Sequence, residues 1–326
     1  MNPLTGLYGA ATMLRNTLFD RGVLSSRRLE HPVVSIGNLS VGGSGKTPFV
    51  IALGDLLKAR GISFDVLSRG YGRKTRGVLP VEPDGNAADF GDEPLLIARR
   101  LGVPVIVGES RYKAGQLAEQ KFRPQLHLLD DGFQHRSLAR DFDIVLMTEA
   151  DFDDQLLPSG RLREPLSSLQ RADAIVLPAA LELDAPSRRD AASRVSRGVL
   201  QQKPIWRIER KLVLPNLPAE PVVLCGIARP EQFFAQVRAA GIAPAAEIEF
   251  RDHHSYNRSD IEHLLAMRAK LGPGGFLTTE KDAVNLGSLR TELQPLTVAA
   301  LNLTIDRPAD LVDAILARIE KRKPRS

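Results

Sequence analysis

The sequence predicts an α/β fold in which helices flank a mainly parallel sheet, followed by a second, smaller α/β unit. From residue 32 onward, short apolar runs alternate with stretches of helical periodicity. A glycine-rich loop and an acidic pair directly follow two of these runs. Such alternation is typical of parallel sheets covered on both faces, which bind ligands at the carboxyl ends of their strands. The expected strands span 32–37, 63–68, 104–108, 126–130, 143–147 and 174–178, and the expected helices span 46–60, 93–102, 110–121 and 166–171.

The segment after the first expected strand has the composition of a phosphate-binding loop. Residues 37–48 read GNLSVGGSGKTP and lead into a predicted helix. Inward-facing N–H groups at such a loop bind phosphates, Lys46 adds a positive charge, and the Thr47 hydroxyl is placed to hold Mg²⁺. Ser40 stands where the strict pattern has glycine. The alternative is a glycine-rich turn before a helix, but we expect a nucleoside triphosphate site made by Gly42, Gly43, Ser44, Gly45, Lys46 and Thr47.

Two acidic segments follow later in the same unit. Asp130 and Asp131 end an apolar strand, as the Mg²⁺-holding acids of phosphoryl-transfer proteins do, although a solvated turn before Gly132 is the alternative. Asp92 and Glu93 open a predicted helix. Acids at that position commonly cap helices, and from the residues alone this interpretation is favoured over a carboxylate that accepts a proton from a reacting hydroxyl.

Basic residues follow the second expected strand. The segment 68–74 reads SRGYGRK and lies where this fold keeps its ligands, so its cations suit a phosphate or an anionic headgroup. The segment 158–165, which contains Arg161 and Arg163, has the same potential. Lone surface arginines are common, so both segments stay open between binding and solvation.

The regular alternation breaks between residues 196 and 220, where an extended connector is expected. A second α/β unit follows, with strands 221–226, 246–250, 275–279 and 297–301 and helices 230–240 and 258–271. A final helix, 308–321, ends in a basic tail. Within this unit, residues 251–256 read RDHHSY, and a histidine there either tunes a catalytic carboxylate or contacts phosphate, with a surface loop as the alternative. Residues 278–282 read TTEKD, and Glu280 interrupts the guanine-reading pattern that they otherwise approach.

Composition narrows the class of protein. The net charge of +5 indicates an anionic partner, which is a nucleic acid, a phosphorylated substrate or a membrane surface. The single cysteine excludes an intrachain disulfide, and no apolar run is long enough to span a bilayer. At the N-terminus, apolar residues recur every three or four positions beside several arginines. This helix either lies at a membrane interface or packs on the protein's own core.

Taken in order, these segments resemble the tetraacyldisaccharide 4'-kinase family of Gram-negative bacteria. Seven segments carry the resemblance across nearly the whole chain, and the family's phosphate loop departs from the strict pattern at the position of Ser40. They span residues 37–48, 68–72, 91–94, 130–135, 157–165, 252–253 and 279–283.

The resemblance implies a P-loop NTPase-like domain joined by a β-ribbon to a smaller domain, and ATP-dependent transfer of the γ-phosphoryl group to the 4'-hydroxyl of an acylated glucosamine disaccharide 1-phosphate. It implies a membrane-associating helix at 1–30, a kinase domain at 31–200, a linker at 201–220, a smaller domain at 221–305, and a C-terminal helix and tail at 306–326. The expected location is the cytoplasmic face of the inner membrane, as a peripheral protein. No nucleic acid and no obligate protein partner are expected.

Site residues are implied in the same way. Asp92 resembles a general base, and His253 resembles its helper, although His254 is not excluded. Lys46 of the phosphate loop is the third implied catalytic residue. The remaining residues divide into metal ligands and substrate-binding residues. The implied Mg²⁺ ligands are Thr47, Asp130, Asp131 and Glu164, and the implied substrate-binding residues are Arg69, Tyr71, Arg73, Glu93 and Arg163.

Two other functions stay open from the residues. A P-loop kinase of a soluble sugar or nucleotide needs the same phosphate loop but no membrane helix. A nucleotide-driven switch or a nucleic-acid-binding ATPase would use the positive charge. Aromatic residues make up only 5% of the chain, which argues against the stacking platforms that single-stranded nucleic acids require.

Overall fold

A computed structural model describes residues 2–181, 198, 200–216, 218–272 and 274–322. Its larger unit is built on six parallel strands in the order β7-β6-β1-β5-β2-β4, with a short antiparallel strand, β3, at the edge. Nearly every residue of the six strands is buried, as expected for a parallel sheet covered on both faces. The strands are β1 (Val33–Asn38), β2 (Phe64–Ser68), β3 (Leu79–Pro80), β4 (Val105–Val107), β5 (Leu126–Asp130), β6 (Phe142–Leu146) and β7 (Ala174–Pro178).

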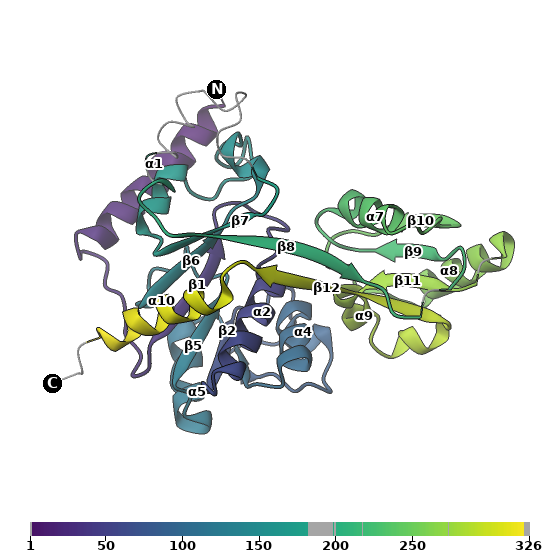
Figure 1. The fold of residues 1–326 in the computed structure, drawn as a ribbon, viewed down its shortest axis with the longest axis horizontal. Coiled ribbons are helices and arrows are strands. Elements are labelled where there is room, and N and C mark those ends of the chain that lie inside the picture. Colours follow the sequence, from purple (N-terminus) through teal and green to yellow (C-terminus); the bar gives the residue numbers. More distant parts are fainter. Residues whose placement is uncertain (1, 182–197, 199, 217, 273, 323–326) are drawn as a thin grey trace.

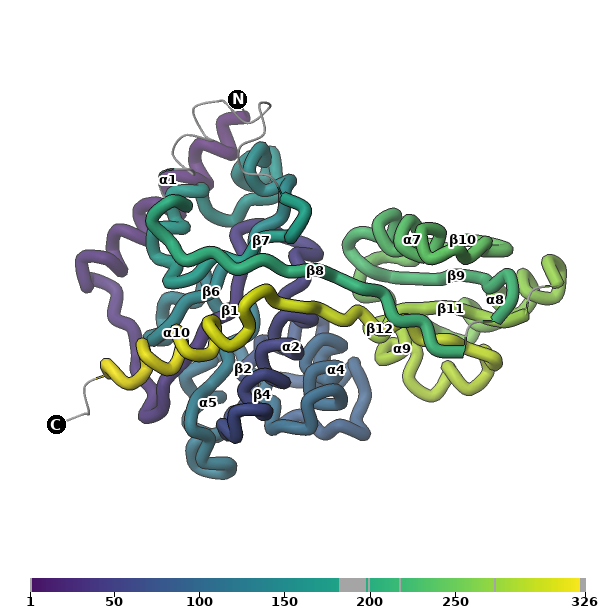
Figure 2. The backbone as a smooth tube through the Cα atoms, in the orientation of Figure 1, coloured from purple at the N-terminus to yellow at the C-terminus, as the bar shows by residue number. Residues whose placement is uncertain are grey.

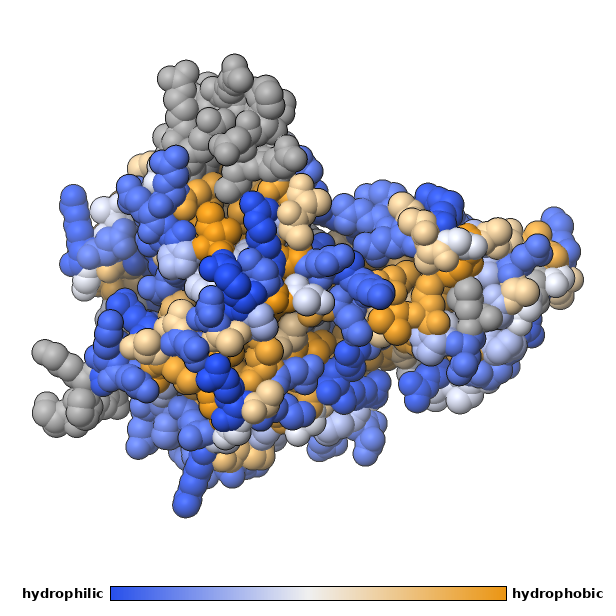
Figure 3. Space-filling view, in the orientation of Figure 1, coloured by the Kyte–Doolittle hydropathy of each residue, from blue (hydrophilic) through white to orange (hydrophobic). Residues whose placement is uncertain are grey.

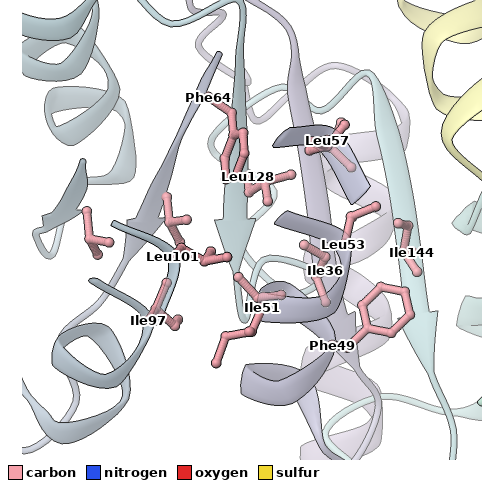
Figure 4. Close-up of a cluster of buried hydrophobic side chains, with 14 of the residues drawn as sticks. Ile36, Phe49, Ile51, Leu53, Leu57, Phe64, Ile97, Leu101, Leu128 and Ile144 are labelled. Carbon is pink, nitrogen blue, oxygen red and sulfur yellow. The ribbon is translucent and has the colours of Figure 1, made fainter. Parts of the chain in front are cut away.

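Helices cover both faces of this sheet. On one face, α2 (Lys46–Ala59), α4 (Asp92–Leu101) and α10 (Pro308–Glu320) pack their apolar residues onto the strands. Figure 4 shows Phe49, Leu53 and Leu57 of α2 directed at the sheet, where Ile36 and Leu128 meet them. On the other face, α5 (Arg111–Phe122) packs onto β2 and β4. The core is therefore continuous beneath the carboxyl ends of β1, β2 and β5.

A two-stranded ribbon connects this unit to the smaller one. It consists of β8 (Ile205–Val213) and β12 (Leu296–Ile305), which pair antiparallel along residues 208–213 and 300–305. The start of β8 also pairs parallel with β7, and the start of β12 pairs parallel with β11. Each ribbon strand therefore belongs to one sheet at its start and to the ribbon at its end, which makes one twelve-stranded sheet (Figure 1).

The smaller unit has a four-stranded parallel sheet in the order β10-β9-β11-β12. The chain leaves the larger unit through β8 and returns through β12 into α10, so α10 lies on the larger unit (Figure 2). Hydrophilic side chains cover most of the viewed face, and apolar side chains show on both units (Figure 3). The other elements here are β9 (Val222–Cys225), α7 (Pro230–Ala239), β10 (Ala246–Glu249), α8 (Arg258–Leu271), β11 (Phe276–Thr279) and α9 (Glu280–Leu286).

Some elements differ from those predicted. Residues 166–171 form a 3₁₀ helix and not an α-helix. β12 is twice the expected length because its second half pairs with β8. Two short helices, α3 (Ala87–Phe90) and α9, were not predicted. Residues 323–326 of the basic tail lie outside the described residues.

The N-terminal helix α1 (Pro3–Asp20) lies along the larger unit and leaves apolar side chains in solvent. Leu4, Leu7, Met13 and Leu14 are all more than half exposed. Buried Asn16 donates a hydrogen bond of 2.7 Å to the carboxylate of Glu164, which fixes the helix to the body of the protein. In the part of the chain that the structure describes, no helix combines the length and apolarity needed to cross a bilayer.

Candidate active site

A cavity of about 750 Å³ opens between the two units at the carboxyl ends of β1, β2 and β5. The phosphate loop, the segment after β2 and the acidic pair after β5 line it from the larger unit. The ribbon, α7 and the loop that carries His253 line it from the smaller side. Segments far apart in the sequence therefore converge at the sheet edge where this fold binds ligands.

The phosphate loop wraps the N-terminus of α2. Gly42 and Gly45 both adopt positive φ, of 88° and 85°, which only glycine adopts without strain. Gly45 is the N-cap of α2, and no side chain satisfies the first N–H groups of this helix. Lys46 Nζ lies 3.1 Å from Asn38 Oδ1 and 3.3 Å from Asp131 Oδ1, so its ammonium group is held over the loop. Free N–H groups and this cation together form an anion site.

The acidic pair after β5 has two different environments. Asp130 is buried, accepts a 3.0 Å hydrogen bond from Ser68 Oγ on Oδ2, and leaves Oδ1 without a partner. Burial and the nearby charges of Glu93 and Asp131 raise the pKa of Asp130 to about 7. Asp131 instead accepts a hydrogen bond of 2.9 Å from Arg163 Nη1. Burial alone would raise the pKa of Asp131, but the cations Lys46 and Arg163 lower it.

Asp92 pairs with His253 across the two units. Asp92 begins α4 and is only 4% exposed, and its Oδ2 lies 2.9 Å from His253 Nδ1. Asn285 Nδ2 donates a second bond of 3.0 Å to the same oxygen. Gly91 turns the chain into this position with a φ of 89°, and a Cβ there would lie 2.9 Å from the Tyr71 carbonyl oxygen. His253 itself has a φ of 59°, an unusual backbone strain for a histidine that often marks functional sites.

Lys281 completes this cluster from α9. Its Nζ lies 2.8 Å from Asp252 Oδ1, 3.3 Å from His253 Nε2 and 3.9 Å from Asp92 Oδ2. Burial alone would raise the pKa of Asp92, but the hydrogen bond from His253 and the charge of Lys281 lower it. Burial alone would lower the pKa of His253, but the hydrogen bond to Asp92 raises it. The cluster therefore keeps Asp92 ionised at neutral pH.

A second cavity of about 310 Å³ adjoins Asp131 on the side of α1. Three arginines line it, namely Arg69, Arg111 and Arg163. Arg111 is only 6% exposed, and its Nε has no hydrogen-bond partner. Burial and the charge of Arg69 lower the pKa of Arg111. Glu109 and Asp131 also line this cavity, so its three cations exceed its two carboxylates and suit an added anion.

Most of the predicted site residues meet at these two cavities. The structure brings the phosphate loop together with Arg69, Tyr71 and Glu93. Burial raises the pKa of Glu93. The Tyr71 ring lies 5.1 Å from that of His253. The capping interpretation of the 91–94 segment is incomplete, because Asp92 does accept the Glu93 N–H yet also binds His253. The predicted residues that line the first cavity are Gly42, Gly43, Ser44, Gly45, Lys46, Thr47, Arg69, Tyr71, Glu93, Asp130, Asp131, Arg163 and His253.

Three predicted residues do not line either cavity. Asp92 is buried against His253, which does line the first one. Glu164 has a 1% exposed side chain, and Asn16 and Arg171 occupy its carboxylate at 2.7 Å and 2.9 Å. Arg73 donates to the Gly77 carbonyl and to Glu109, both at 2.6 Å, and does not line either cavity. Glu164 therefore ties α1 to the body, and Arg73 holds the loop after β2.

The sequence interpretation missed several residues of the site. Arg111 and Asn285 are brought in by tertiary packing, and a single polar residue on a helix carries no local signal. Lys281 lies in the TTEKD segment, but that segment did not indicate its contacts with His253 and Asp92. Arg210 had a signal, because it lies in the alternating strand segment WRIERKL, on the same face as the buried Trp206. A charged residue among buried apolar neighbours requires a partner.

The residues after β1 and β5 fit Mg²⁺. The unpartnered Oδ1 of Asp130, the carboxylate of Asp131 and the Thr47 hydroxyl line the same cavity. Oxygen atoms are the ligands that Mg²⁺ prefers, and it usually takes only one or two carboxylates together with phosphates. Consistent with this, no cluster of three or more His, Cys, Asp or Glu able to hold a metal by itself occurs among the described residues.

Comparisons with known proteins agree with the geometry. A family model described as tetraacyldisaccharide-1-P 4'-kinase matches residues 1–320. A tetraacyldisaccharide 4'-kinase from Koribacter versatilis is 47% identical and covers 99% of this chain and 100% of its own length. The enzyme from Geobacter metallireducens is 37% identical over 94% of each chain. A crystal structure of LpxK from Aquifex aeolicus in complex with ATP has a TM-score of 0.77 and 34% identity, covering 97% of this chain and 98% of that one.

Proposed function

The chain belongs to the tetraacyldisaccharide-1-P 4'-kinase family, and on this premise we propose how its residues divide the work of phosphoryl transfer. It is an ATP-dependent kinase that transfers the γ-phosphoryl group to the 4'-hydroxyl of tetraacyldisaccharide 1-phosphate, in lipid A biosynthesis. The proposal rests chiefly on one observation: His253, which binds Asp92, lines the same cavity as the phosphate loop.

In this proposal ATP lies with its phosphates on the loop. The N–H groups from Gly42 to Thr47 surround the β-phosphate, and Lys46 contacts the γ-phosphate. Thr47, Asp130 and Asp131 would hold Mg²⁺, which when bound neutralises phosphate charge. The rise in the pKa of Asp130 supports this assignment, because a buried carboxylate beside two other acids is a site that a cation stabilises.

Asp92 acts as the general base. The acceptor oxygen forms a bond to the γ-phosphorus as the bond to the β,γ-bridging oxygen breaks, and the hydroxyl proton passes to an Asp92 carboxylate oxygen. His253 and Asn285 orient Asp92, while Lys281 helps to keep it ionised. Glu93 follows directly on α4, where it is placed to position the acceptor.

The arginine-lined cavity suits the acceptor. We assign the 1-phosphate of the disaccharide to Arg69, Arg111 and Arg163, since their three cations match a phosphate dianion. Tyr71, which is 65% exposed, provides an open face for a sugar ring at the entrance. The reaction therefore joins two neighbouring anion sites, one for each substrate.

The acyl chains belong at a membrane surface. Helix α1 carries exposed apolar residues, and its Tyr8 hydroxyl donates a hydrogen bond of 3.0 Å to the Arg163 carbonyl oxygen. Arg163 lines the arginine-lined cavity, so this helix lies next to that cavity. An amphipathic helix of this kind buries its apolar face in the headgroup region. We therefore propose that residues 1–30 attach the kinase domain to the cytoplasmic face of the inner membrane, as a peripheral protein.

The test is transfer of label from [γ-³²P]ATP to tetraacyldisaccharide 1-phosphate in detergent micelles with Mg²⁺. Wild type and the exposed control Asp55→Ala should label the 4' position equally, whereas Lys46→Ala and Asp92→Ala should not label it. Equal labelling by Asp92→Ala would refute the assignment of the base. Mg²⁺ is tested by titrating EDTA into the same assay and restoring the ion.

A further inference from the structure

Two arginines from outside the phosphate loop approach it from the ribbon and from the smaller unit. Arg210 lies on β8, and its Nη2 donates to the Ser44 carbonyl oxygen at 2.5 Å. Arg229 is the N-cap residue of α7, and its Cγ lies 4.0 Å from the position that a Cβ on Gly43 would take. Both residues line the cavity that contains the loop. The loop is therefore faced by cations that do not belong to its own motif.

The positive charges of Arg210 and Arg229 are not balanced by an acidic residue in the described part of the chain. No ion pair joins Arg210 or Arg229 to an acidic residue within the described ranges, and the nitrogen atoms Arg210 Nε and Arg229 Nη2 are buried without hydrogen-bond partners. Burial and the charge of Arg229 lower the pKa of Arg210. Two unpaired guanidinium groups held close together are costly unless an anion joins them.

The position of Arg210 on its strand strengthens this point. Trp206, Ile208 and Leu212 share the face of β8 that points inward, and Trp206 and Ile208 belong to the hydrophobic core. Arg210 thus takes a place in an apolar row, and among the described residues the Ser44 carbonyl oxygen is the acceptor of its hydrogen bond. The neighbouring Lys211 points to the opposite face and is exposed.

We propose that Arg210 and Arg229 bind the polyphosphate chain of the nucleotide from the side opposite the phosphate loop. Their contacts with the nucleotide would tie the ribbon and the smaller unit to the phosphates. This inference rests on the proposed position of ATP. It adds two nucleotide-binding residues that the phosphate-loop motif does not contain.

The space around the loop agrees with the proposal. A Cβ added to Gly45 would lie 2.5 Å from Arg210 Nη2, so a side chain at this position would push the guanidinium away. The apolar residues Leu212, Ile227 and Leu301 line the same cavity next to the arginines. They provide a surface for the base of the nucleotide, which would leave the phosphates between the arginines and the loop.

The experiment measures dissociation constants for ATP, ADP and AMP by calorimetry, without acceptor, in wild type and in Arg210→Met and Arg229→Met. Each substitution should weaken ATP binding about 10-fold, with a smaller loss for ADP and almost none for AMP, because charge-assisted hydrogen bonds to phosphate are lost. Arg210→Lys should recover part of the ATP affinity. Lys211→Met and Arg238→Met, which remove exposed cations from the same strand and the same helix, should change no affinity.

Two outcomes would overturn the proposal. Equal weakening of ATP, ADP and AMP would show that the arginines only shape the loop, and unchanged affinities would show that they do not contact the nucleotide. Circular dichroism melting of each variant identifies loss of folding. Failure of the wild type to phosphorylate the disaccharide would instead count against the proposed function, and it would leave the nucleotide measurements intact.

Discussion

Two histidine–carboxylate pairs lie at opposite edges of the large sheet, and their surroundings differ completely. His127 and Asp65 are partners at the amino ends of β5 and β2, and neither side chain has any solvent exposure. His253 and Asp92 lie at the carboxyl edge and join two units across a cavity. The chemical groups are the same, so the differences in environment explain their different roles.

The ring nitrogens show the difference most clearly. His127 Nδ1 lies 2.9 Å from both oxygens of Asp65, and its Nε2 lies 3.3 Å from Glu119 Oε1. His253 instead has a carboxylate on Nδ1 and the ammonium group of Lys281 on Nε2. A ring between two carboxylates holds its proton firmly, whereas the cation beside His253 opposes the effect of its carboxylate partner. The first pair therefore stabilises the fold, and the second serves the reaction.

Replacement of the carboxylate in the cavity should have the largest effect. Asp92→Asn should lower kcat by about 10²- to 10⁴-fold, because the amide cannot accept the proton. The melting temperature should stay close to that of the wild type, since the amide keeps the volume of the side chain. Steady-state kinetics with Asp55→Asn as the exposed control check this, and an unchanged kcat for Asp92→Asn would remove the contrast between the pairs.

The matching change in the buried pair should act on stability alone. Asp65→Asn leaves a buried imidazolium with one partner fewer, so the free energy of unfolding should fall by about 3–5 kcal/mol while kcat of the folded enzyme is kept. Urea unfolding measures this. The control is Asp313→Asn, which breaks the exposed ion pair with Arg60 and should cost less than about 1 kcal/mol. Similar losses for the two variants would contradict the structural role of Asp65.

Stability should also depend on pH through His127. Burial alone would lower its pKa, but hydrogen bonds to Asp65 and Glu119 raise it to about 9, above the unfolded value near 6.5. The stabilisation is therefore complete below pH 6.5 and is lost as the pH rises through 9, a loss of about 3 kcal/mol. Urea titrations from pH 6 to pH 10 should show this slope in the wild type and not in His127→Asn. Parallel curves would exclude a raised pKa.

The smallest effect is expected at His253. His253→Ala removes the hydrogen bond that helps to lower the pKa of Asp92, and burial then raises that pKa. The acidic limb of the pH–kcat profile should move to higher pH, and kcat at neutral pH should fall about 10-fold through poorer orientation of the base. His254→Ala is the control, because His254 bonds to Asp260 and not to Asp92. An unmoved acidic limb would separate His253 from the base.

The contrast between local and tertiary signals explains how much could be predicted. The phosphate loop is contiguous, so its residues could be named from the sequence, as could the alternation of strands and helices along the chain. Arg111 and Asn285 reach the cavities only through packing. Glu164 belongs to a recognisable segment, but the side chains of Asn16 and Arg171 occupy its carboxylate, and this contact cannot be read from the segment itself.

Secondary structure shows the same limit. The run at 297–301 predicted a short strand, and its full extent depends on pairing with β8, about ninety residues earlier in the chain. Residues 166–171 have enough apolar character for an α-helix, yet they form a short 3₁₀ helix between Pro165 and β7. Helix α9 is capped by Thr279, whose hydroxyl accepts the Asp282 N–H, a signal that was present but overlooked.

The path of the ribbon has a consequence for synthesis of the protein on the ribosome. The core of the larger unit includes Ile305, Leu311 and Ile315, which are translated after the smaller unit. The strands β9, β10 and β11 of the smaller unit emerge before them. Domains usually fold in the order of translation. Here the strands of the larger unit have an open sheet edge at β8 until β12 and α10 are translated, while the smaller unit can already begin to assemble.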